Sequence, residues 1–338
     1  MIKAGAQVLV IIVARIGDTL LVTPALRALK AAIPRGRLTV LAHPKRLEVL
    51  QHLPFIDVLE GVTKTSAHAR GWMGKRRYDL ALVYGQDAAL VRYALRASDR
   101  VIAFAQKDAN LNSRIAHLVP DPVEPQHAVL HRLSLLAPLG LAAEYLRLAY
   151  SVTQEEHADA RKWLAAHVPG GRPLIGLQIA SFPTKAHRDW PVSSFQELIA
   201  RILATHAEAH FLLLGDKAAA EKAAPLLRAY PGPLSLVAGS MSLRQSAALM
   251  AELDLYIGVD TGPTHIAGAL GIPMVALYHS AYPGRNLVPL QHSACSMIEH
   301  PLTESSAAIT AAMSDIPVER VWQAAKAQLA NMMIGSKP

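Results

Sequence analysis

Residues 254–285 read DLYIGVDTGPTHIAGALGIPMVALYHSAYPGR, and this stretch decides the fold class. Its apolar, partly β-branched segment 255–259 is typical of a buried parallel strand. The polar turn that follows contains Pro263, which suits the first turn of a helix. We predict a short helix over residues 264–270 and a second strand over residues 273–277, so the stretch forms one strand–helix–strand unit.

The turn between this first strand and the helix is a candidate anion site. A helix N-terminus at the carboxyl end of a parallel strand offers free N–H groups and a positive dipole to a phosphate. The stretch also holds glycines that let the backbone approach a ligand, namely Gly258, Gly262, Gly268 and Gly271. An ordinary strand–helix turn capped by Asp260 is the structural alternative, and both interpretations fit the sequence of the turn.

The composition favours a two-domain α/β protein. A chain of 338 residues is long for a single core, and 51% of its residues are hydrophobic while only 5% are aromatic. The one cysteine, Cys295, cannot form an internal disulfide, so nothing points to an oxidising compartment. The apolar segment 8–14 lacks a signal-peptide cleavage site and is shorter than the roughly 20 residues of a membrane span. We therefore predict a first buried strand there and a cytoplasmic protein.

The charge is concentrated in the first part of the chain. Residues 1–150 carry a net charge of +9, whereas residues 151–338 carry −1. A basic half predicts an anionic partner, which is a nucleic acid, a phosphorylated glycolipid or the anionic inner leaflet of a membrane. Solvated surface arginines are the alternative. Nucleic acid is disfavoured because the chain has no recognised reading motif and few aromatic residues among the basic ones.

Strands and helices alternate along the rest of the chain, which indicates doubly wound parallel sheets. The first half contains predicted strands at 7–13, 38–42, 80–84 and 100–104 and predicted helices at 19–33, 45–52, 88–97 and 127–139. The second half contains predicted strands at 173–179, 210–214 and 234–237 and predicted helices at 153–167, 193–206, 217–230, 242–253 and 318–332. Two of these helices open with capping pairs, Thr153 with Glu156 and Ser242 with Gln245.

A junction within residues 141–172 divides the chain into domains at 1–150 and 151–338, and the last helix could pack back on the first domain. Two stretches lack a clear periodicity. Residues 110–126 are rich in proline and are predicted to be irregular. Residues 64–77 are predicted to form a basic loop that faces an anionic acceptor through Lys64, Arg70, Lys75, Arg76 and Arg77. A solvated connection is the alternative for both stretches.

Residues 260–273, DTGPTHIAGALGIP, resemble the signature of the ADP-heptose:lipopolysaccharide heptosyltransferases, glycosyltransferase family 9. The resemblance implies a GT-B fold, which is an α/β architecture of two Rossmann-like doubly wound domains facing a central cleft. It also implies that the first domain binds the acceptor and the second binds the nucleotide-sugar donor. In such sheets, ligands lie at the carboxyl ends of the strands.

The resemblance assigns donor contacts to the organising stretch. Asp260, Thr261, Gly262 and His265 match the donor-binding D-T-G-x-x-H positions of the family. Thr261 and the turn amides can bond diphosphate oxygens, and His265 can neutralise charge on the leaving group. A satisfied structural histidine is the alternative for His265.

A second donor patch is expected at residues 180–191, ASFPTKAHRDWP, directly after a strand. The family shows a small or hydroxyl cluster there, followed by Lys-x-Trp-Pro, and Ser181 and Thr184 supply hydroxyls. Arg188 stands at the family's lysine position, and Lys185 lies three residues upstream. Either cation could clamp the diphosphate, and an arginine would do so with two parallel hydrogen bonds.

Other donor contacts are expected at strand ends. Asp216 and Glu221 compete for the role of binding a ribose hydroxyl. Met241 resembles the position that lines the adenine pocket, although a methionine there is also consistent with a core residue. Residues 278–280, Tyr-His-Ser, depart from the family's more usual Tyr-Gly-Pro or Phe-Gly-Pro, so a different base or sugar contact is open at this position.

The catalytic candidate is Asp18. Residues 17–26 resemble the family's first loop, in which an aspartate takes the proton from the acceptor hydroxyl. A carboxylate there can act as the base in a single in-line displacement with inversion at the anomeric carbon. A plain helix N-cap is the alternative for Asp18. Arg15 is placed to bind an acceptor phosphate or carboxylate.

The chain has no D-x-D and no H-E-x-x-H motif, so a metal-independent reaction without a cofactor is expected. No G-x-G-x-x-G follows the first strand, which argues against a nicotinamide dehydrogenase. We therefore expect an inverting transferase that moves heptose from ADP-heptose to a lipopolysaccharide inner-core acceptor, in the cytoplasm, where peripheral contact with the inner membrane is compatible with its charge. The alternatives are another donor or acceptor within the family, a nucleotide-sugar epimerase of the same fold, and a non-catalytic nucleotide-sugar binder.

Overall fold

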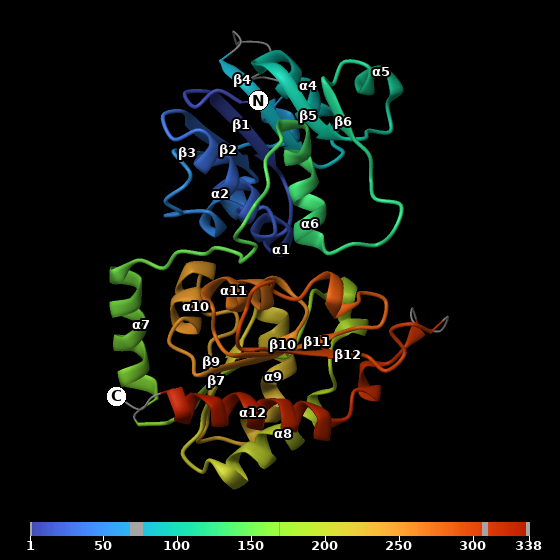
Figure 1. Ribbon diagram of the computed structural model, residues 1–338. Helices are drawn as coiled ribbons and strands as arrows, with labels where there is room; N and C mark the ends of the chain where they lie inside the picture. Colours follow the sequence, from blue (N-terminus) through green and yellow to red (C-terminus); the bar gives the residue numbers. More distant parts are fainter. Residues whose placement is uncertain (1, 68–76, 169, 306–309, 336–338) are drawn as a thin grey trace. The chain divides into compact units, whose positions relative to one another are not determined.

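The computed structural model describes residues 2–67, 77–168, 170–305 and 310–335 (Figure 1). Its contacts divide the chain into two compact units, Met1–Ser151 and Val152–Pro338. Each unit is built on one six-stranded sheet whose described strand pairs are all parallel. Among the helices of the described ranges, none combines the length and the apolar character needed to cross a membrane.

Both sheets have the same strand order. The first sheet consists of β1 (Gln7–Ile12), β2 (Arg37–Ala42), β3 (Val58–Gly61), β4 (Tyr78–Tyr84), β5 (Ser98–Phe104) and β6 (His117–Val119). The second consists of β7 (Leu174–Gln178), β8 (His210–Leu214), β9 (Leu234–Leu236), β10 (Leu255–Val259), β11 (Met274–Tyr278) and β12 (Cys295–Glu299). The orders are β3-β2-β1-β4-β5-β6 and β12-β11-β10-β7-β8-β9, so the chain reverses direction across the sheet between β1 and β4 and between β7 and β10. Ligands of doubly wound sheets bind at this reversal.

Helices cover both faces of the first sheet. They are α1 (Ile16–Leu20), α2 (Thr23–Ala32), α4 (Ala88–Ala97), α5 (Ala109–Asn112) and α6 (Ala128–Leu133), with 3₁₀ segments η1 (Pro44–Val49) and η2 (Ser134–Leu139). Alternate residues of a strand point to opposite faces. In β1, Val8 and Val10 pack with α2 and η2, whereas Leu9 and Ile11 pack with α4. Apolar residues on both faces explain why β1 reads as a continuous hydrophobic run.

The prediction of one helix over residues 19–33 is wrong, because the chain forms two helices. α1 ends at Leu20 and α2 begins at Thr23. Pro24 lies in the first turn of α2 and has no N–H to donate to the carbonyl oxygen of Leu20. The Thr23 hydroxyl donates to that oxygen instead, at 2.7 Å. The break makes α1 a separate short element, directly after β1, that carries Asp18.

Two other sequence predictions need correction, and one strand was not predicted. The stretch 110–126 is not entirely irregular, because it includes the end of α5 and the short edge strand β6. The predicted helix at 45–52 is instead η1, opened by His43 and Pro44. β12 was not predicted, since its sequence, CSMIE, mixes polar and apolar residues and is recognised as a strand only through its pairing with β11.

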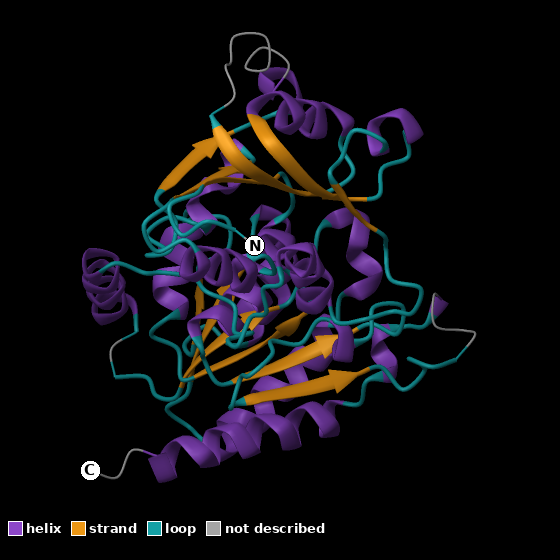
Figure 2. Ribbon diagram, turned by 45° about the horizontal axis from the view of Figure 1, so that its top comes forward, coloured by secondary structure: helices purple, strands orange, loops and turns teal. Residues whose placement is uncertain are grey.

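The second unit also has helices on both faces of its sheet (Figures 1 and 2). They are α7 (Gln154–His167), α8 (Val192–Thr205), α9 (Lys217–Ala229), α10 (Leu243–Met250), α11 (Gly262–Leu270) and α12 (Val318–Gly335). One core cluster joins α8, α9 and α12 to the sheet, and Figure 1 shows α10 and α11 on the opposite side. The capping pairs predicted for α7 and α10 are confirmed.

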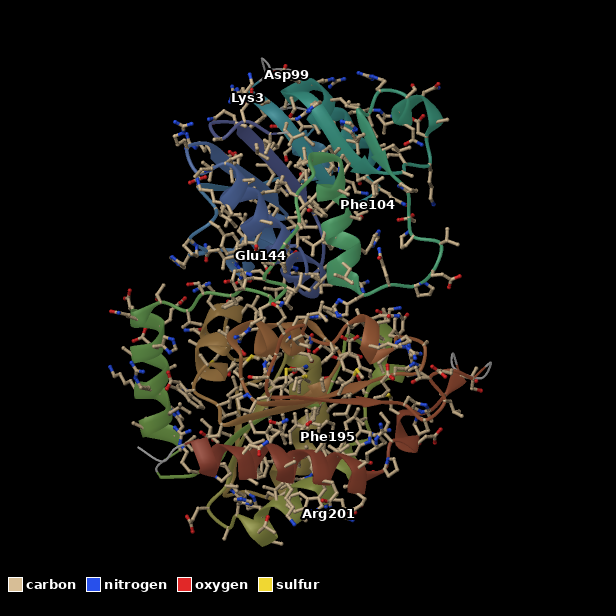
Figure 3. All side chains as sticks on the ribbon, viewed as in Figure 1. Lys3, Asp99, Phe104, Glu144, Phe195 and Arg201 are labelled. Atoms are coloured by element: carbon tan, nitrogen blue, oxygen red, sulfur yellow. The ribbon has the colours of Figure 1, made fainter. Side chains whose placement is uncertain are left out.

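The last helix packs within the second unit. α12 contacts α8 and strands β10, β11 and β12, and its residues Val321 and Leu329 belong to the core of that unit. Phe195 of α8 is fully buried in the same cluster, while Arg201 of α8 pairs with Glu319 of α12 (Figure 3). An apolar face and an ion pair therefore fix α12 beside α8.

Candidate active site

The turn between β10 and α11 is closed by Thr264. Its hydroxyl donates to the carbonyl oxygen of Val259 at 2.6 Å and accepts from the N–H of Thr261 at 3.3 Å. The buried hydroxyl of Tyr256 lies 2.9 Å from the same oxygen atom of Thr264. Thr264 thus satisfies backbone groups at the start of α11, and the carboxylate of Asp260 is directed to other partners.

The glycines of this stretch serve packing more than ligand approach. A Cβ atom on Gly258 would lie 2.6 Å from the Cβ of Gln178, and one on Gly268 would overlap the ring of Pro289. Gly271 ends α11 with a φ of 76°, a left-handed conformation that favours glycine. Gly262 is the one of these four that stands in the first turn of α11. The expectation that all four admit a ligand is therefore corrected for the other three.

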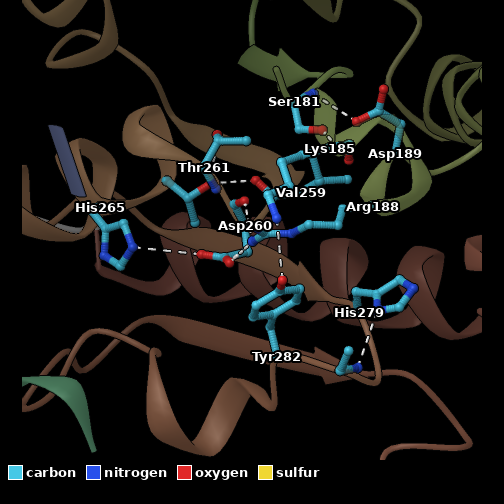
Figure 4. A network of polar contacts seen from close by, with 12 residues as sticks. Ser181, Lys185, Arg188, Asp189, Val259, Asp260, Thr261, His265, His279 and Tyr282 are labelled. Carbon is cyan, nitrogen blue, oxygen red and sulfur yellow. Dashed lines mark hydrogen bonds and ion pairs between the residues drawn. The ribbon is translucent and has the colours of Figure 1, made fainter. Parts of the chain in front are cut away.

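Asp260 is the centre of a buried polar network (Figure 4). Nη2 of Arg188 donates to the Asp260 carbonyl oxygen at 2.8 Å and also pairs with its carboxylate. Nε2 of His265 lies 3.5 Å from Oδ1 of Asp260. The side chains of Arg188, Asp260 and His265 are only 14%, 7% and 8% exposed. Buried charges need such partners, because an isolated carboxylate is strongly destabilised away from water.

The network spans the strand-order reversal of the second sheet. Arg188 ends the segment η3 (Pro183–Arg188) after β7, and Asp260 directly follows β10, the strand paired with β7. The contact therefore joins two loops at the carboxyl edge of the sheet. This is the place where doubly wound sheets bind nucleotides.

The loop that carries the two cations is internally bonded. The N–H of Ser181 donates to Oδ1 of Asp189 at 2.6 Å, and the Ser181 hydroxyl donates to the carbonyl of Lys185 at 2.7 Å. Lys222 of α9 pairs with the Asp189 carboxylate. The Ser181 hydroxyl therefore donates its proton within the loop, whereas Thr184 is exposed. Asp189 and Lys222 were not predicted, because their partners come from distant segments.

Tyr282 lies beneath both cations of this loop. Cζ of Arg188 is 4.5 Å from the centroid of the Tyr282 ring, within the range of cation–π contacts. Nζ of Lys185 is 5.8 Å from the same centroid and 3.5 Å from the hydroxyl oxygen. Tyr282 was not predicted as a site residue, because in the sequence it is only an aromatic residue in the loop after β11.

His279 holds the loop after β11 in place. It is buried, its Nδ1 accepts from the N–H of Ala281 at 3.1 Å, and its Nε2 lies 3.0 Å from the carbonyl oxygen of Ala311. Burial, with a smaller effect from His187, lowers the pKa of His279 and favours the neutral imidazole. The departure from the family pattern at this position is thus a structural histidine.

The remaining donor candidates lie nearby in the fold but have other surroundings. Asp216 follows β8 and caps α9, accepting from the N–H of Ala219 at 3.1 Å. Glu221 is exposed on α9, one residue before Lys222. Met241 is half-buried before α10. Asp216 stands at the carboxyl edge of the sheet, next to the β7 loop, because β8 pairs with β7.

In the first unit, Asp18 occupies the first turn of α1, after β1. The N-cap of α1 is Arg15, so the N-cap interpretation of Asp18 is wrong. Oδ1 of Asp18 lies 3.3 Å from Nη2 of Arg132 in α6, and the Asp18 side chain is 43% exposed. Arg15 is exposed. The structure therefore presents an accessible carboxylate at the reversal between β1 and β4, and it adds Arg132, which the sequence did not single out.

The stretch 64–77, predicted to be a basic loop, is only partly described, and its residues 64–67 are helical, which corrects the prediction there. Lys64 is exposed and pairs with Asp87, which follows β4, at 2.6 Å. Arg77 precedes β4, and its N–H donates to Ala97, so it lies at the amino edge of the sheet and not beside Asp18. Arg70, Lys75 and Arg76 lie outside the described residues. Among the residues that are described, there is no group of three His, Cys, Asp or Glu side chains arranged for a metal ion.

These features define the class of the protein. Two doubly wound parallel sheets, each with polar side chains at its strand-order reversal, are the two domains of the GT-B fold. The family model for glycosyltransferase family 9 (heptosyltransferase) matches residues 69–311, and the chain belongs to this family. It is therefore a glycosyltransferase. The matched residues include the Asp260 network, whereas Asp18 lies before them.

Individual relatives agree with this assignment. Lipopolysaccharide heptosyltransferase 3 from Escherichia coli is 25% identical over 283 residues, which cover 78% of this chain and 80% of the relative. The crystal structure of a family 9 glycosyltransferase from Veillonella parvula is 19% identical, with a TM-score of 0.82 over 98% of this chain and 99% of that one. The structure of E. coli ADP-heptose lps heptosyltransferase II is 20% identical, with a TM-score of 0.76 over 97% and 99%. The two structures confirm the predicted fold class.

Proposed function

We propose that the protein is an inverting heptosyltransferase that transfers a heptose from ADP-heptose to an inner-core acceptor of lipopolysaccharide. The family and the names of its relatives support the sugar and the acceptor class. The observation that carries the proposal is the buried contact of Arg188 and His265 with Asp260 at the strand-order reversal of the second sheet. The network supports the proposal because it brings cations and a helix N-terminus together at the strand-order reversal, a setting that favours binding of a nucleotide diphosphate.

The donor diphosphate would bind at the first turn of α11. The free N–H groups of that turn and the Thr261 hydroxyl would donate to phosphate oxygens, and Lys185 and Arg188 would balance their charge. His265, held by Asp260, would stabilise negative charge on the departing phosphate. The further donor contacts proposed here are those of Ser181, Thr184, Asp216, Glu221, Met241 and Gly262.

The acceptor would react beside Asp18. The Asp18 carboxylate takes the proton of the acceptor hydroxyl, whose oxygen forms a bond to the anomeric carbon on the face opposite the diphosphate. The bond from that carbon to the diphosphate breaks, and ADP leaves with the electron pair. Arg132 contacts Oδ1 of Asp18, so Oδ2 is the oxygen proposed to accept the proton.

The charge of the first half of the chain supports a proposal for the acceptor and for contact with a membrane. Its net charge of +9 favours an anionic glycolipid acceptor, with contact at the cytoplasmic face of the inner membrane. Arg15 and the basic residues of the 64–77 loop would contact the acceptor. Lys185 and Arg188 supply positive charge for diphosphate departure, so the proposed reaction needs no metal ion.

Transfer can be measured directly as ADP release from ADP-heptose in the presence of a lipopolysaccharide acceptor lacking the added heptose. We expect turnover by the wild-type chain and a loss of about 10²-fold or more in the Asp18→Asn variant, because a general base contributes on this scale. Donor affinity should be unchanged in this variant. Asp159→Asn, which changes an exposed carboxylate on α7, is the matched control and should keep full activity.

Each alternative gives a different result in this assay. An epimerase would isomerise the donor without an acceptor, and a non-catalytic binder would bind the donor but release no ADP. Thermal stabilisation by ADP-sugars over UDP- and GDP-sugars tests the nucleotide. Equal stabilisation by all three nucleotide-sugars would contradict ADP-heptose as the donor. Unchanged transfer by Asp18→Asn would contradict the role of Asp18 as the general base.

A further inference from the structure

Tyr282 is the one aromatic ring that contacts both candidate diphosphate cations in the described part of the site. It comes from the loop between β11 and η4 (Gly284–Asn286), whereas Lys185 and Arg188 come from the loop after β7. The ring faces the Arg188 guanidinium at 4.5 Å, and its hydroxyl lies 3.5 Å from Nζ of Lys185 (Figure 4).

The two cations are held to different degrees. Arg188 is mostly buried, and its Nη2 bonds both the carbonyl and the carboxylate of Asp260. The contact between Lys185 and Tyr282 is at the long limit for a hydrogen bond, and its ammonium lies toward the edge of the cation–π range. Arg188 is therefore a fixed charge, whereas the Lys185 ammonium is held only weakly at the end of a flexible stem.

We propose that Tyr282 is a positioning residue that sets both cations for the donor diphosphate, with Arg188 stacked on its ring and Lys185 held at its hydroxyl until the phosphate binds. This inference rests on the proposed donor site. A planar guanidinium can stack on an aromatic face while its edge groups remain bonded to Asp260, which fixes its orientation in two directions. The Tyr282 hydroxyl would hold Lys185 near the turn without the strong ion pair that a carboxylate would form there.

The loop that carries Tyr282 is itself held by the hydrogen bonds of His279, so Tyr282 is a rigid support for the two cations. Buried His279 bonds Ala281 and Ala311 on either side, and Tyr282 follows two residues after Ser280, which is also buried. The N–H of Tyr282 donates to the carbonyl of His279 at 2.8 Å. Such short-range bonds limit the freedom of the ring before a ligand arrives, which reduces the entropy lost on binding.

The test is calorimetric titration of the purified full-length chain with ADP. We expect Tyr282→Leu to raise the Kd for ADP about tenfold, the scale of a desolvated cation–π contact. Tyr282→Phe keeps the ring and should raise it by no more than about threefold, the scale of the weaker hydroxyl contact. Tyr145→Leu, which changes a tyrosine that is 67% exposed in the other unit, is the control and should bind as wild type does.

A double-variant cycle separates positioning from a general structural effect. If Tyr282 acts through the cations, Tyr282→Leu should lose little further ADP affinity in an Arg188→Gln chain. Should Arg188→Gln prevent folding, the same cycle is run with Lys185→Gln, where the combined loss should be smaller than the product of the single losses. Thermal unfolding of each variant shows that the fold is retained.

The inference and the proposed function can fail separately. If the wild-type chain binds ADP and Tyr282→Leu binds equally well, or if the losses in the cycle multiply fully, Tyr282 does not position the cations. A loss in Tyr282→Phe as large as that in Tyr282→Leu would also overturn the stacking role. If the wild-type chain binds neither ADP nor ADP-heptose, the donor site and the inference fall together.

Discussion

Nε2 of His265 lies 3.5 Å from Oδ1 of Asp260, and both side chains are buried at the start of α11. Asp260 directly follows β10 and His265 lies in the first turn of α11, so the local geometry of the chain sets this contact. The same carboxylate also pairs with Arg188, which comes from a different βα unit. One acidic group therefore orients two basic side chains toward the site proposed for the diphosphate.

Replacing His265 should reduce turnover more than it reduces folding. We expect His265→Asn to lower kcat/KM for ADP-heptose by about 10²-fold, because it removes a group placed to stabilise leaving-group charge. Steady-state ADP release measures the effect. His117→Asn, at an exposed histidine of β6, should leave kcat/KM unchanged. A variant at position 265 with wild-type kcat/KM would show that this histidine is only structural.

Thr264 should matter through its hydroxyl. Thr264→Val keeps the shape of the side chain but leaves the Val259 carbonyl and the buried Tyr256 hydroxyl without this partner, at a cost of about 1–3 kcal/mol. Urea unfolding of the second unit would report this loss. Thr264→Ser retains the hydroxyl and should keep most of the stability. A Thr264→Val variant as stable as wild type would show that the hydroxyl contributes nothing to stability.

The ion pair between Lys222 and Asp189 should support the cation-bearing loop. Asp189 is 8% exposed while Lys222 is 40% exposed, so Lys222→Met should cost only about 1 kcal/mol of stability. We expect a weaker affinity for ADP as well, since the loop from Ser181 to Arg188 loses an anchor. Titration with ADP checks this, and Lys162→Met on the exposed face of α7 is the control. If the ADP affinity of Lys222→Met is unchanged, the contact between α9 and the cation-bearing loop does not contribute to ADP binding.

Glu156 should give the second unit an acid-sensitive contact. Hydrogen bonds from Arg244 are the largest cause that lowers the pKa of Glu156 from 4.5 to about 2. A carboxyl whose folded pKa is depressed contributes stability that is full above its unfolded pKa and is lost as the pH falls through the folded value. The contribution should therefore decrease between pH 4.5 and about 2.

Glu156→Gln isolates this charge, because a glutamine at the third helical position can still complete the cap with Thr153. Urea unfolding at pH 7 should show the variant to be about 1 kcal/mol less stable than wild type. The difference should shrink when the measurement is repeated at a pH below 4.5. A difference that stays constant with pH would assign the effect to packing.

Local sequence determined most elements of this fold, although β12 was recognised only through its pairing with β11. The bounds of β8, β10 and α4 agree with those predicted, because a short apolar run or an amphipathic period is a property of neighbouring residues. The capping pairs Thr153–Glu156 and Ser242–Gln245 were also readable, since both partners lie within one helical turn. The motif from residue 260 to residue 273 led to the correct family for the same reason, being one continuous segment.

Only the tertiary structure decided which side chains meet. Arg188 and Asp260 are separated by 72 positions in the chain, and Asp18 and Arg132 by 114. Their contacts depend on the order of strands in each sheet, and nothing in the spacing of the residues specifies that β10 lies beside β7. The same holds for Tyr282 beneath Lys185 and Arg188. The sequence thus determined most of the elements and the family, whereas the order of the strands decided which charges are neutralised and which groups form the candidate site.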